Sequence, residues 1–280
     1  MVNVVIMQHA GPDDYASGHA AIAAAQALVD SGAKVLQIFF YGPGVLYASH
    51  HLHFPSGVNN LQQQWLEFAK TQHIPLVVCS TVANQYGIEP SPPPSGSLAA
   101  GFSSGGLTEF MEALSTADTL LQFQPEPELQ HPLQHSLQQK QGTAREFLQR
   151  NSKTAKHIAK EPASDASDAA LLFEFNHSPW QAISRHGLDM LLMAVSLDIP
   201  CQAIYNNAAL SQLVVPTEQS GHDPLKKIAM LCDVFDFTEF YSSANDLVAV
   251  DSKQYRVPLQ EASAEQITQM KASAKHHIIF

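Results

Sequence analysis

The same order of short apolar segments and helical segments occurs twice along this chain, and this duplication restricts the fold more than any other feature. The first copy consists of apolar runs at 3–7, 34–41, 76–79 and 119–123 and helical patterns at 20–28, 58–70 and 107–114. Continuous apolar runs of this length are typical of strands buried in a parallel sheet. Their alternation with helices predicts an α/β fold, with a mainly parallel sheet between helical layers.

The second copy begins near residue 168. It consists of apolar runs at 169–175, 200–205, 239–242 and 276–280 and helical patterns at 187–197, 225–232 and 264–274. The two copies also end alike, because 117–123 (ADTLLQF) and 274–280 (AKHHIIF) have the same apolar spacing. The sequence therefore predicts two tandem three-layer α/β domains, at 1–123 and 168–280. The Gln- and Pro-rich segment 124–167 is predicted to be a linker, with one short helical segment at 143–150.

Charge and cysteine content exclude several classes of protein. The chain has 15 Lys and Arg against 26 Asp and Glu, a formal net charge of −11. This balance argues against extended contact with nucleic acids and with anionic membrane surfaces, since both attract cations. Three cysteines in 280 residues do not form a disulfide framework. With no signal-peptide pattern and no apolar run long enough to span a bilayer, we expect a cytoplasmic protein.

Reactive groups in open parallel sheets collect at the carboxyl ends of the strands. In the first copy, the residues near these ends are His9, Tyr41 and Cys79. Cys79 precedes Ser80 and Thr81, which are residue types that often cap a helix. A helix start stabilises the thiolate form of a nearby cysteine by about 0.3–1 kcal/mol. This is too little to ionise most of the thiol at neutral pH, so another group or a partner would have to stabilise the thiolate further. A buried, inert cysteine explains the position equally well.

The other candidate groups give weaker signals. Cys201 in a strand and Cys232 on the apolar face of a helix are interpreted as packing residues. The run His50, His51 and His53, with His9 nearby, suggests a metal site, but without paired cysteines a surface cluster is favoured. The chain has no P-loop and no G-x-S-x-G motif, and the glycine-rich segment 101–107 follows a proline-rich loop rather than a clear strand. No cofactor is predicted.

Several motifs in the first copy occur together in one known family. They are FFY at 39–41 with Gly44 and Val45, LVVC at 76–79 with Gly87, GFSSGGL at 101–107, and the endings at 117–118 and 122–123. With these motifs, nearly all of residues 1–123 resembles the DsrE/TusD sulfurtransferase family. The second copy is similar to the TusC/DsrF subunit in Ser178-Pro179, in RHGLDMLL at 185–192 and in IIF at 278–280.

The resemblance implies a fusion of two subunits that act in a sulfur relay. In such a relay the cysteine matching Cys79 accepts sulfane sulfur from a TusA-like donor as a persulfide and passes it to a TusE/DsrC-like acceptor. The sulfur then serves 2-thiouridine synthesis in tRNA or, in related systems, sulfur oxidation. His9, Tyr41, Ser80 and Thr81 would support Cys79 without a metal or cofactor. A homo-oligomer, with a TusB/DsrH-like subunit as a further partner, is expected.

The chain departs from the family pattern in two places. Members similar to TusD tend to have two arginines shortly after the cysteine, where this chain has Gln85 and Tyr86. In the second copy the position matching Cys79 falls near Tyr241 and Ser242, with no cysteine. Two hypotheses therefore remain beside the relay: a non-catalytic docking or assembly module, and a metal-dependent protein that uses the histidine run at 50–53.

Overall fold

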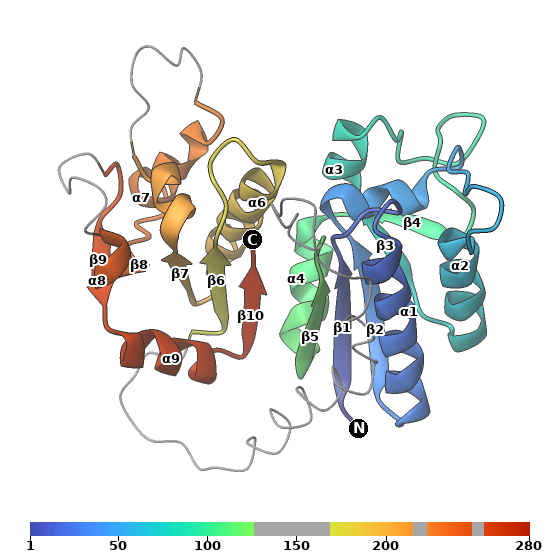
Figure 1. The fold of residues 1–280 in the computed structure, drawn as a ribbon, viewed down its shortest axis with the longest axis horizontal. Coiled ribbons are helices and arrows are strands. Elements are labelled where there is room, and N and C mark those ends of the chain that lie inside the picture. The colour runs from blue at the N-terminus through green and yellow to red at the C-terminus, as the bar shows by residue number, and fades with distance from the viewer. Residues whose placement is uncertain (126–168, 215–222, 248–254) are drawn as a thin grey trace, which may run out of the picture. The chain divides into compact units, whose positions relative to one another are not determined.

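The computed structural model describes residues 1–125, 169–214, 223–247 and 255–280. The chain divides into two compact units, Met1–Ala166 and Ser167–Phe280, and each unit contains its own five-stranded sheet (Figure 1). The predicted linker at 124–167 and its helical segment at 143–150 lie outside the described residues, except for Gln124 and Pro125. Among the described helices, none combines the length and the apolar character needed to cross a bilayer.

The first unit has a fully parallel sheet in the order β4-β3-β2-β1-β5. Its strands are β1 (Asn3–Gln8), β2 (Lys34–Phe40), β3 (Leu76–Cys79), β4 (Phe102–Gly105) and β5 (Thr119–Phe123). Its helices are α1 (Tyr15–Asp30), the 3-10 helix η1 (Gly42–Ala48), α2 (Leu61–Gln72), α3 (Ser80–Gln85) and α4 (Leu107–Thr116). The predicted α/β fold is confirmed, but the glycine-rich segment at 101–107 contains a strand, β4, that the sequence pattern did not indicate.

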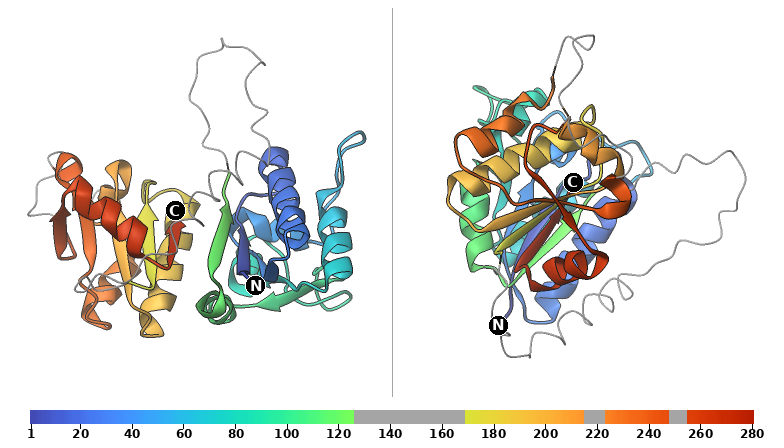
Figure 2. Two further views of the ribbon diagram at one scale, coloured as in Figure 1. Left: turned by 90° about the horizontal axis from the view of Figure 1, so that it is seen from below. Right: turned by 90° about the vertical axis from the view of Figure 1, so that its left-hand side faces the viewer.

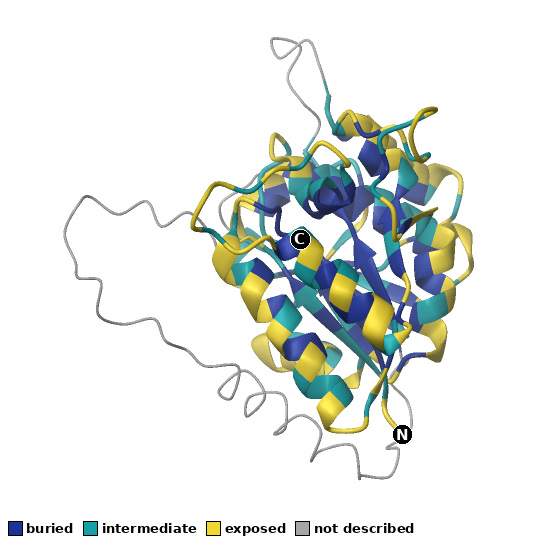
Figure 3. Cartoon of the chain, turned by 90° about the vertical axis from the view of Figure 1, so that its right-hand side faces the viewer, coloured by how far each residue is buried: buried dark blue, intermediate teal, exposed yellow. Residues whose placement is uncertain are grey.

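Helices cover both faces of this sheet (Figure 2). The alanine-rich side of α1 and the side of α2 that contains Trp65 and Phe68 are buried on one face. On the other face α4 places the ring of Phe110 on that of Phe39, with the centroids 4.6 Å apart. Figure 3 shows the result, with buried strands behind helices that are buried along one side only.

The second unit repeats this plan with the order β10-β6-β7-β8-β9, again fully parallel. Its strands are β6 (Leu171–Phe175), β7 (Cys201–Tyr205), β8 (Phe240–Ser243), β9 (Leu259–Ala262) and β10 (His276–Ile279). Its helices are α6 (Ala182–Ser196), η2 (Asn207–Gln212), η4 (Lys226–Ile228), α7 (Ala229–Asp233), α8 (Ala244–Leu247) and α9 (Ala264–Ser273). The helix predicted at 225–232 is found as two consecutive helical segments, the 3-10 turn η4 and the short α-helix α7.

A matching backbone hydrogen bond shows that the first and last strands of the two units are equivalent. The residue after β1, His9, donates its N–H to the carbonyl of Phe123 at the end of β5. In the second unit Asn176 donates in the same way to Phe280, which follows β10. The similar endings at 117–123 and 274–280 therefore form the same edge strand in each sheet.

The last helix of each unit is held to its sheet differently. Whereas α4 buries Phe110, Met111 and Leu114, α9 buries no residue. Instead, Lys271 of α9 forms an ion pair with Glu174 of β6, at 2.8 Å, and His277 of β10 contacts the same carboxylate oxygen at 2.7 Å. An ion pair on a buried carboxylate thus replaces apolar packing at this position of the second unit.

Candidate functional site

The carboxyl ends of three neighbouring strands in the first unit meet at one edge of the sheet, as the sequence predicts. His9 follows β1, Tyr41 follows β2 and Cys79 ends β3. His9 and Tyr41 are both buried, and their rings meet edge to face with centroids 6.0 Å apart. The structure therefore brings His9 and Tyr41 into contact at the same edge as Cys79.

Cys79 is at once the last residue of β3 and the residue that precedes α3. In β3 it pairs with Gly105 of β4, and it occupies the N-cap position of α3 without a side-chain capping hydrogen bond. Ser80 is the first helical residue, half-buried, and Thr81 is exposed, so neither is the cap that the sequence suggested. The Cys79 residue is 2% exposed.

The loop between β2 and η1 lies directly against His9. Gly42 has a φ of +54°, and a methyl carbon at this position would lie within 2.8 Å of three ring atoms of His9. The N–H of Gly44 donates to the carbonyl of His9 at 2.9 Å. Glycine at 42 therefore allows the backbone to approach the imidazole closely, which keeps the ring under η1.

Carboxylates surround this edge of the sheet. Asp14 caps α1 by accepting from the N–H of Ser17 at 3.0 Å, and Asp13 beside it is exposed. Burial raises the pKa of Tyr86, at the end of α3, and the charge of Asp13 raises it further. Beyond β4, Glu109 accepts from the N–H of Gly106 at 2.8 Å, next to the residue that pairs with Cys79. The sequence analysis missed these acidic groups, although their positions directly after the strands could have indicated them.

Among the described residues of the first unit, lysine and arginine are absent from the same edge. Residues 1–125 contain no arginine and only two lysines. Lys34 begins β2 and Lys70 lies in the last turn of α2, so both are at the opposite, amino edge of the sheet. Apart from histidines, the described part of the first unit therefore has no side chain that could neutralise an anion at Cys79.

The second unit has different residues at the equivalent positions. Its strand register places Ser243 of β8 opposite Ala262 of β9, as Cys79 lies opposite Gly105. This corrects the sequence-based match to Tyr241 and Ser242 by one residue. The Ser243 hydroxyl donates to Asp246 of α8 at 2.9 Å. A serine engaged with its own helix thus occupies the position of the cysteine.

The two cysteines of the second unit are poor nucleophiles. Burial and then the charge of Glu239 raise the pKa of Cys201 to about 12. Burial and Asp233 also raise the pKa of the half-buried Cys232. Of the three cysteines, neither Cys201 nor Cys232 therefore offers a thiolate near neutral pH.

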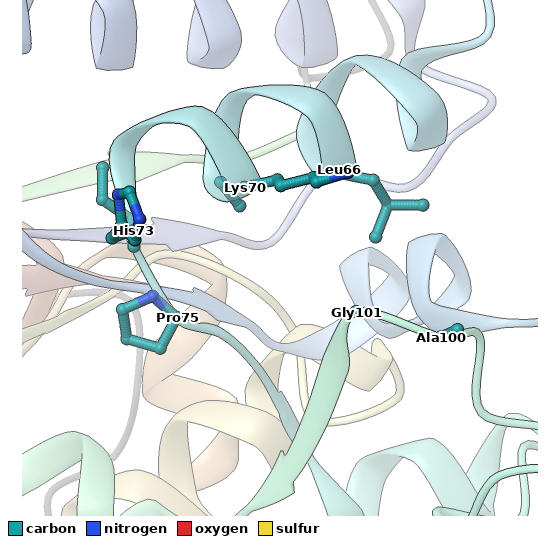
Figure 4. Close-up of a pocket in the computed structure, with 8 residues that line it drawn as sticks. Leu66, Lys70, His73, Pro75, Ala100 and Gly101 are labelled. Atoms are coloured by element: carbon teal, nitrogen blue, oxygen red, sulfur yellow. The ribbon is translucent and has the colours of Figure 1, made fainter.

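The described part of the first unit also contains the histidine run after β2 and a surface hollow. The rings of His50 and His51 lie 4.6 Å apart, and the described residues contain no group of three or more His, Cys, Asp or Glu side chains suited to a metal ion. A hollow of about 640 Å³ between α2 and the start of β4 is shown in Figure 4. Pro75 and Gly101 in its wall precede β3 and β4, so it lies at the edge of the sheet opposite Cys79.

Comparison with known proteins identifies the family. Residues 2–123 match the model of the DsrE/DsrF-like family. A sulfurtransferase TusD homolog of Pasteurella multocida is 35% identical over 108 residues, which are 37% of this chain and 86% of that protein. The chain belongs to the DsrE/DsrF-like family. The sulfurtransferase TusD of Serratia proteamaculans is 34% identical over 106 residues, 35% of this chain and 81% of that protein.

Other relatives give similar values. The sulfurtransferase TusD of Proteus mirabilis is 30% identical over 105 residues, covering 35% of this chain and 81% of that protein. Among solved structures, the ychN protein from E. coli is 26% identical, with a TM-score of 0.37, and the match covers 44% of this chain and all of that one. The family match and the TusD relatives confirm the resemblance to the DsrE/TusD family, and the two parallel sheets agree with two tandem domains of that type.

Proposed function

We propose that this protein is a sulfurtransferase of a sulfur relay, in which Cys79 receives sulfane sulfur as a persulfide and passes it to the thiol of an acceptor protein. The observation that supports this most is the place of Cys79, at the carboxyl end of β3 in the domain that matches the DsrE/DsrF-like family. Relatives of this domain are named as TusD sulfurtransferases. No metal or organic cofactor is needed for the reaction.

The reaction consists of two thiol exchanges. The Cys79 thiolate attacks the outer sulfur of a donor persulfide, the donor S–S bond breaks, and the donor leaves as a thiol after taking up the proton from Cys79. The acceptor thiolate then attacks the outer sulfur on Cys79 in the same way. His9 and Tyr41 lie at this edge and would orient the sulfur or exchange its proton, while Ser80 and Thr81 would supply hydroxyl donors from α3.

The second unit would act as a partner domain of the TusC/DsrF type. Ser243 occupies the position of Cys79 there, and a hydroxyl cannot store sulfane sulfur. We therefore assign the relay to domain 1–123 and an assembly role to domain 168–280, with 124–167 as the linker that keeps them in one-to-one ratio. The linker raises the effective concentration of one domain around the other.

The proposed setting is the cytoplasm, with a TusA-like donor, a TusE/DsrC-like acceptor and 2-thiouridine of tRNA as the final product. A homo-oligomer that includes a TusB/DsrH-like subunit is part of this proposal. A sulfur-oxidation relay would use the same chemistry. In either case the protein exchanges sulfur with other proteins, in keeping with the acidic chain.

Mass spectrometry tests the proposal. The intact protein is incubated with cysteine, a cysteine desulfurase and a TusA-like carrier, and peptides are then mapped. We expect a gain of one sulfur atom on Cys79 that disappears when a TusE/DsrC-like acceptor is added. A Cys201→Ala variant is the matched control and should gain the same sulfur. If Cys79 gains none while a TusD control is labelled in parallel, the relay is excluded.

The second candidate function is a docking module with an inert cysteine. The 2% exposure of Cys79 favours this alternative, as does the lack of lysine and arginine among the described residues at its edge of the sheet. Sulfur transfer in a Cys79→Ala variant separates the two functions. The relay predicts complete loss of transfer, whereas a docking module predicts transfer at the wild-type rate.

A further inference from the structure

The strand register places the carboxylate of Glu109 beside Cys79. Cys79 of β3 pairs with Gly105 of β4, and paired residues of neighbouring parallel strands point to the same face of the sheet, about 4.8 Å apart. A methyl carbon built on Gly105 would lie within 2.5 Å of both Oε2 of Glu109 and Cγ1 of Val77, which is on that face too. The carboxylate oxygen therefore lies within about 7 Å of the Cβ atom of Cys79.

A hydrogen bond holds this carboxylate in place. Oε2 of Glu109 accepts from the backbone N–H of Gly106 at 2.8 Å, at the start of α4. Because Gly105 has no side chain, the carboxylate can lie directly over the backbone of β4. Glu109 is exposed to solvent, but this contact and the hydrogen bond fix its charge on the face of the sheet to which Cys79 points.

The second unit makes the same hydrogen bond without the charge. There Ser243 takes the place of Cys79, and its partner in the neighbouring strand is Ala262 rather than glycine. Gln266, at the third position of α9, accepts from the backbone N–H of the N-cap residue at 2.7 Å. Capping this helix therefore requires no carboxylate. Glycine and glutamate occur beside the cysteine, whereas alanine and glutamine occur beside the serine.

Other titratable groups lie at the same edge of the first sheet. They are the histidine and phenols His9, Tyr41, Tyr47 and Tyr86 and the carboxylates Asp13 and Asp14. Burial raises the pKa of both Tyr47 and Tyr86. These two phenols are therefore neutral at the pH at which a thiol ordinarily ionises. Glu109 differs from the rest of this set because the register and the contact at Gly105 fix its distance from Cys79.

We propose that Glu109 restrains the ionisation of the Cys79 thiol, so that Cys79 stays neutral up to a higher pH than it would beside an uncharged residue. A negative charge about 7 Å away disfavours the thiolate. The thiolate that does form is the stronger nucleophile, since nucleophilicity rises with the pKa of the thiol. The inference rests on the proposed function and makes Glu109 a positioning residue, which acts through its charge on Cys79 and does not touch the sulfur donor.

The absorbance of the thiolate tests this role. The ultraviolet absorbance of the full chain is followed from about pH 6 to 11, and a Cys79→Ser counterpart of each protein subtracts the tyrosines and the other two cysteines. Glu109→Gln keeps the hydrogen-bond acceptor and should lower the midpoint pH of Cys79 by about one unit. Glu67→Gln removes an exposed carboxylate from α2, on the other face of the sheet, and should leave the midpoint unchanged.

The rate of disulfide exchange gives a second measure. The Cys79 thiolate attacks one sulfur of the small, neutral hydroxyethyl disulfide, the S–S bond breaks, and hydroxyethyl thiolate leaves, which mass spectrometry of the Cys79 peptide follows. At about pH 7, Glu109→Gln would have tenfold more thiolate with about threefold lower nucleophilicity, so it should react about threefold faster. A faster reaction without a shifted midpoint would show that the substitution only loosens the site, and would overturn the inference.

Gly105→Ala provides a second variant, because its methyl group would displace the carboxylate of Glu109. It should lower the midpoint in the wild-type background and have no further effect together with Glu109→Gln. An unchanged midpoint in Glu109→Gln, or an equal shift in Glu67→Gln, contradicts the inference. If that happens while Cys79 still gains sulfur from its donor, the relay stands. If the midpoint shifts but Cys79 gains no sulfur, the relay fails and the effect of Glu109 on the thiol stands.

Discussion

Replacing Gly42 by alanine tests the close packing of the backbone on His9. A methyl carbon at this position would lie within 2.8 Å of three ring atoms of His9, and the residue has a φ of +54°. His9 is 1% exposed and its ring also meets Tyr41, so it has little room to move. We therefore expect Gly42→Ala to destabilise the first unit through both backbone strain and overpacking.

The magnitude follows from these two effects. Alanine in the left-handed region costs about 1–2 kcal/mol, and an extra methyl in a closely packed site costs about 1–3 kcal/mol more. Gly57 provides a matched control, since it has a φ of +85° but no neighbouring atom within 4 Å of the place that a methyl carbon would take. Gly57→Ala should therefore show the backbone cost alone, and Gly42→Ala should exceed it by about 1–3 kcal/mol.

Urea unfolding measures this difference. In a Trp180→Phe background the fluorescence of the buried Trp65 reports on the first unit. With an m-value of about 2 kcal/mol/M, the midpoint of Gly42→Ala should lie about 0.5–1.5 M below that of Gly57→Ala. Equal midpoints for the two variants would refute the contact between residue 42 and the imidazole, and with it the placement of His9 at the site.

Three further predictions concern the second unit. Gly187→Ala should destabilise it by about 1–3 kcal/mol, because the methyl would meet the rings of two buried phenylalanines. Hydrogen exchange of the α6 backbone amides, followed by mass spectrometry, measures this, and unchanged protection would contradict the packing of α6. Burial would raise the pKa of Glu174, but hydrogen bonds from His277 and Lys271 outweigh it and lower the pKa to about 2. The resulting stabilisation of about 3 kcal/mol is complete above about pH 4.5 and is lost as the pH falls toward about 2. Glu174→Gln should abolish that pH dependence in urea titrations, and a persisting dependence would disprove the assignment. Finally, iodoacetamide at about pH 8, near the ordinary thiol pKa, should leave Cys201 unmodified in the native protein, and rapid labelling would show that it is not buried as described.

The sequence predicted all the described strands except one edge strand in each sheet. β1, β2, β6 and β7 are largely buried and appear as continuous apolar runs. β4 (Phe102–Gly105) was missed in the first copy and β9 (Leu259–Ala262) in the second. Each has apolar or small residues only at its two ends, with polar, exposed residues between them, since each lies at the edge of its sheet. The sequence of a four-residue run with this pattern cannot be distinguished from that of a loop.

The site was predicted in part. The carboxyl-end rule placed His9, Tyr41 and Cys79 at one edge of the sheet, because parallel strands bring their ends together whatever the details of packing. The burial of Cys79 and the approach of Gly42 to His9 depend on how η1 folds back over the edge, which no local pattern encodes. The roles of the site residues and the limits of the two domains stay predictions.

In each unit, the residue after the first strand donates a hydrogen bond to the end of the last strand. This bond also affects the order of folding during synthesis. His9 can reach its partner Phe123 once residue 123 has been made, whereas Asn176 has to wait for Phe280. At ribosomal rates of about 5–20 residues per second, the first unit is complete roughly 10–30 s before the second. The Cys79 edge can therefore form before its companion domain has been made, in a stage in which the first sheet is closed while the second still lacks its edge strand β10.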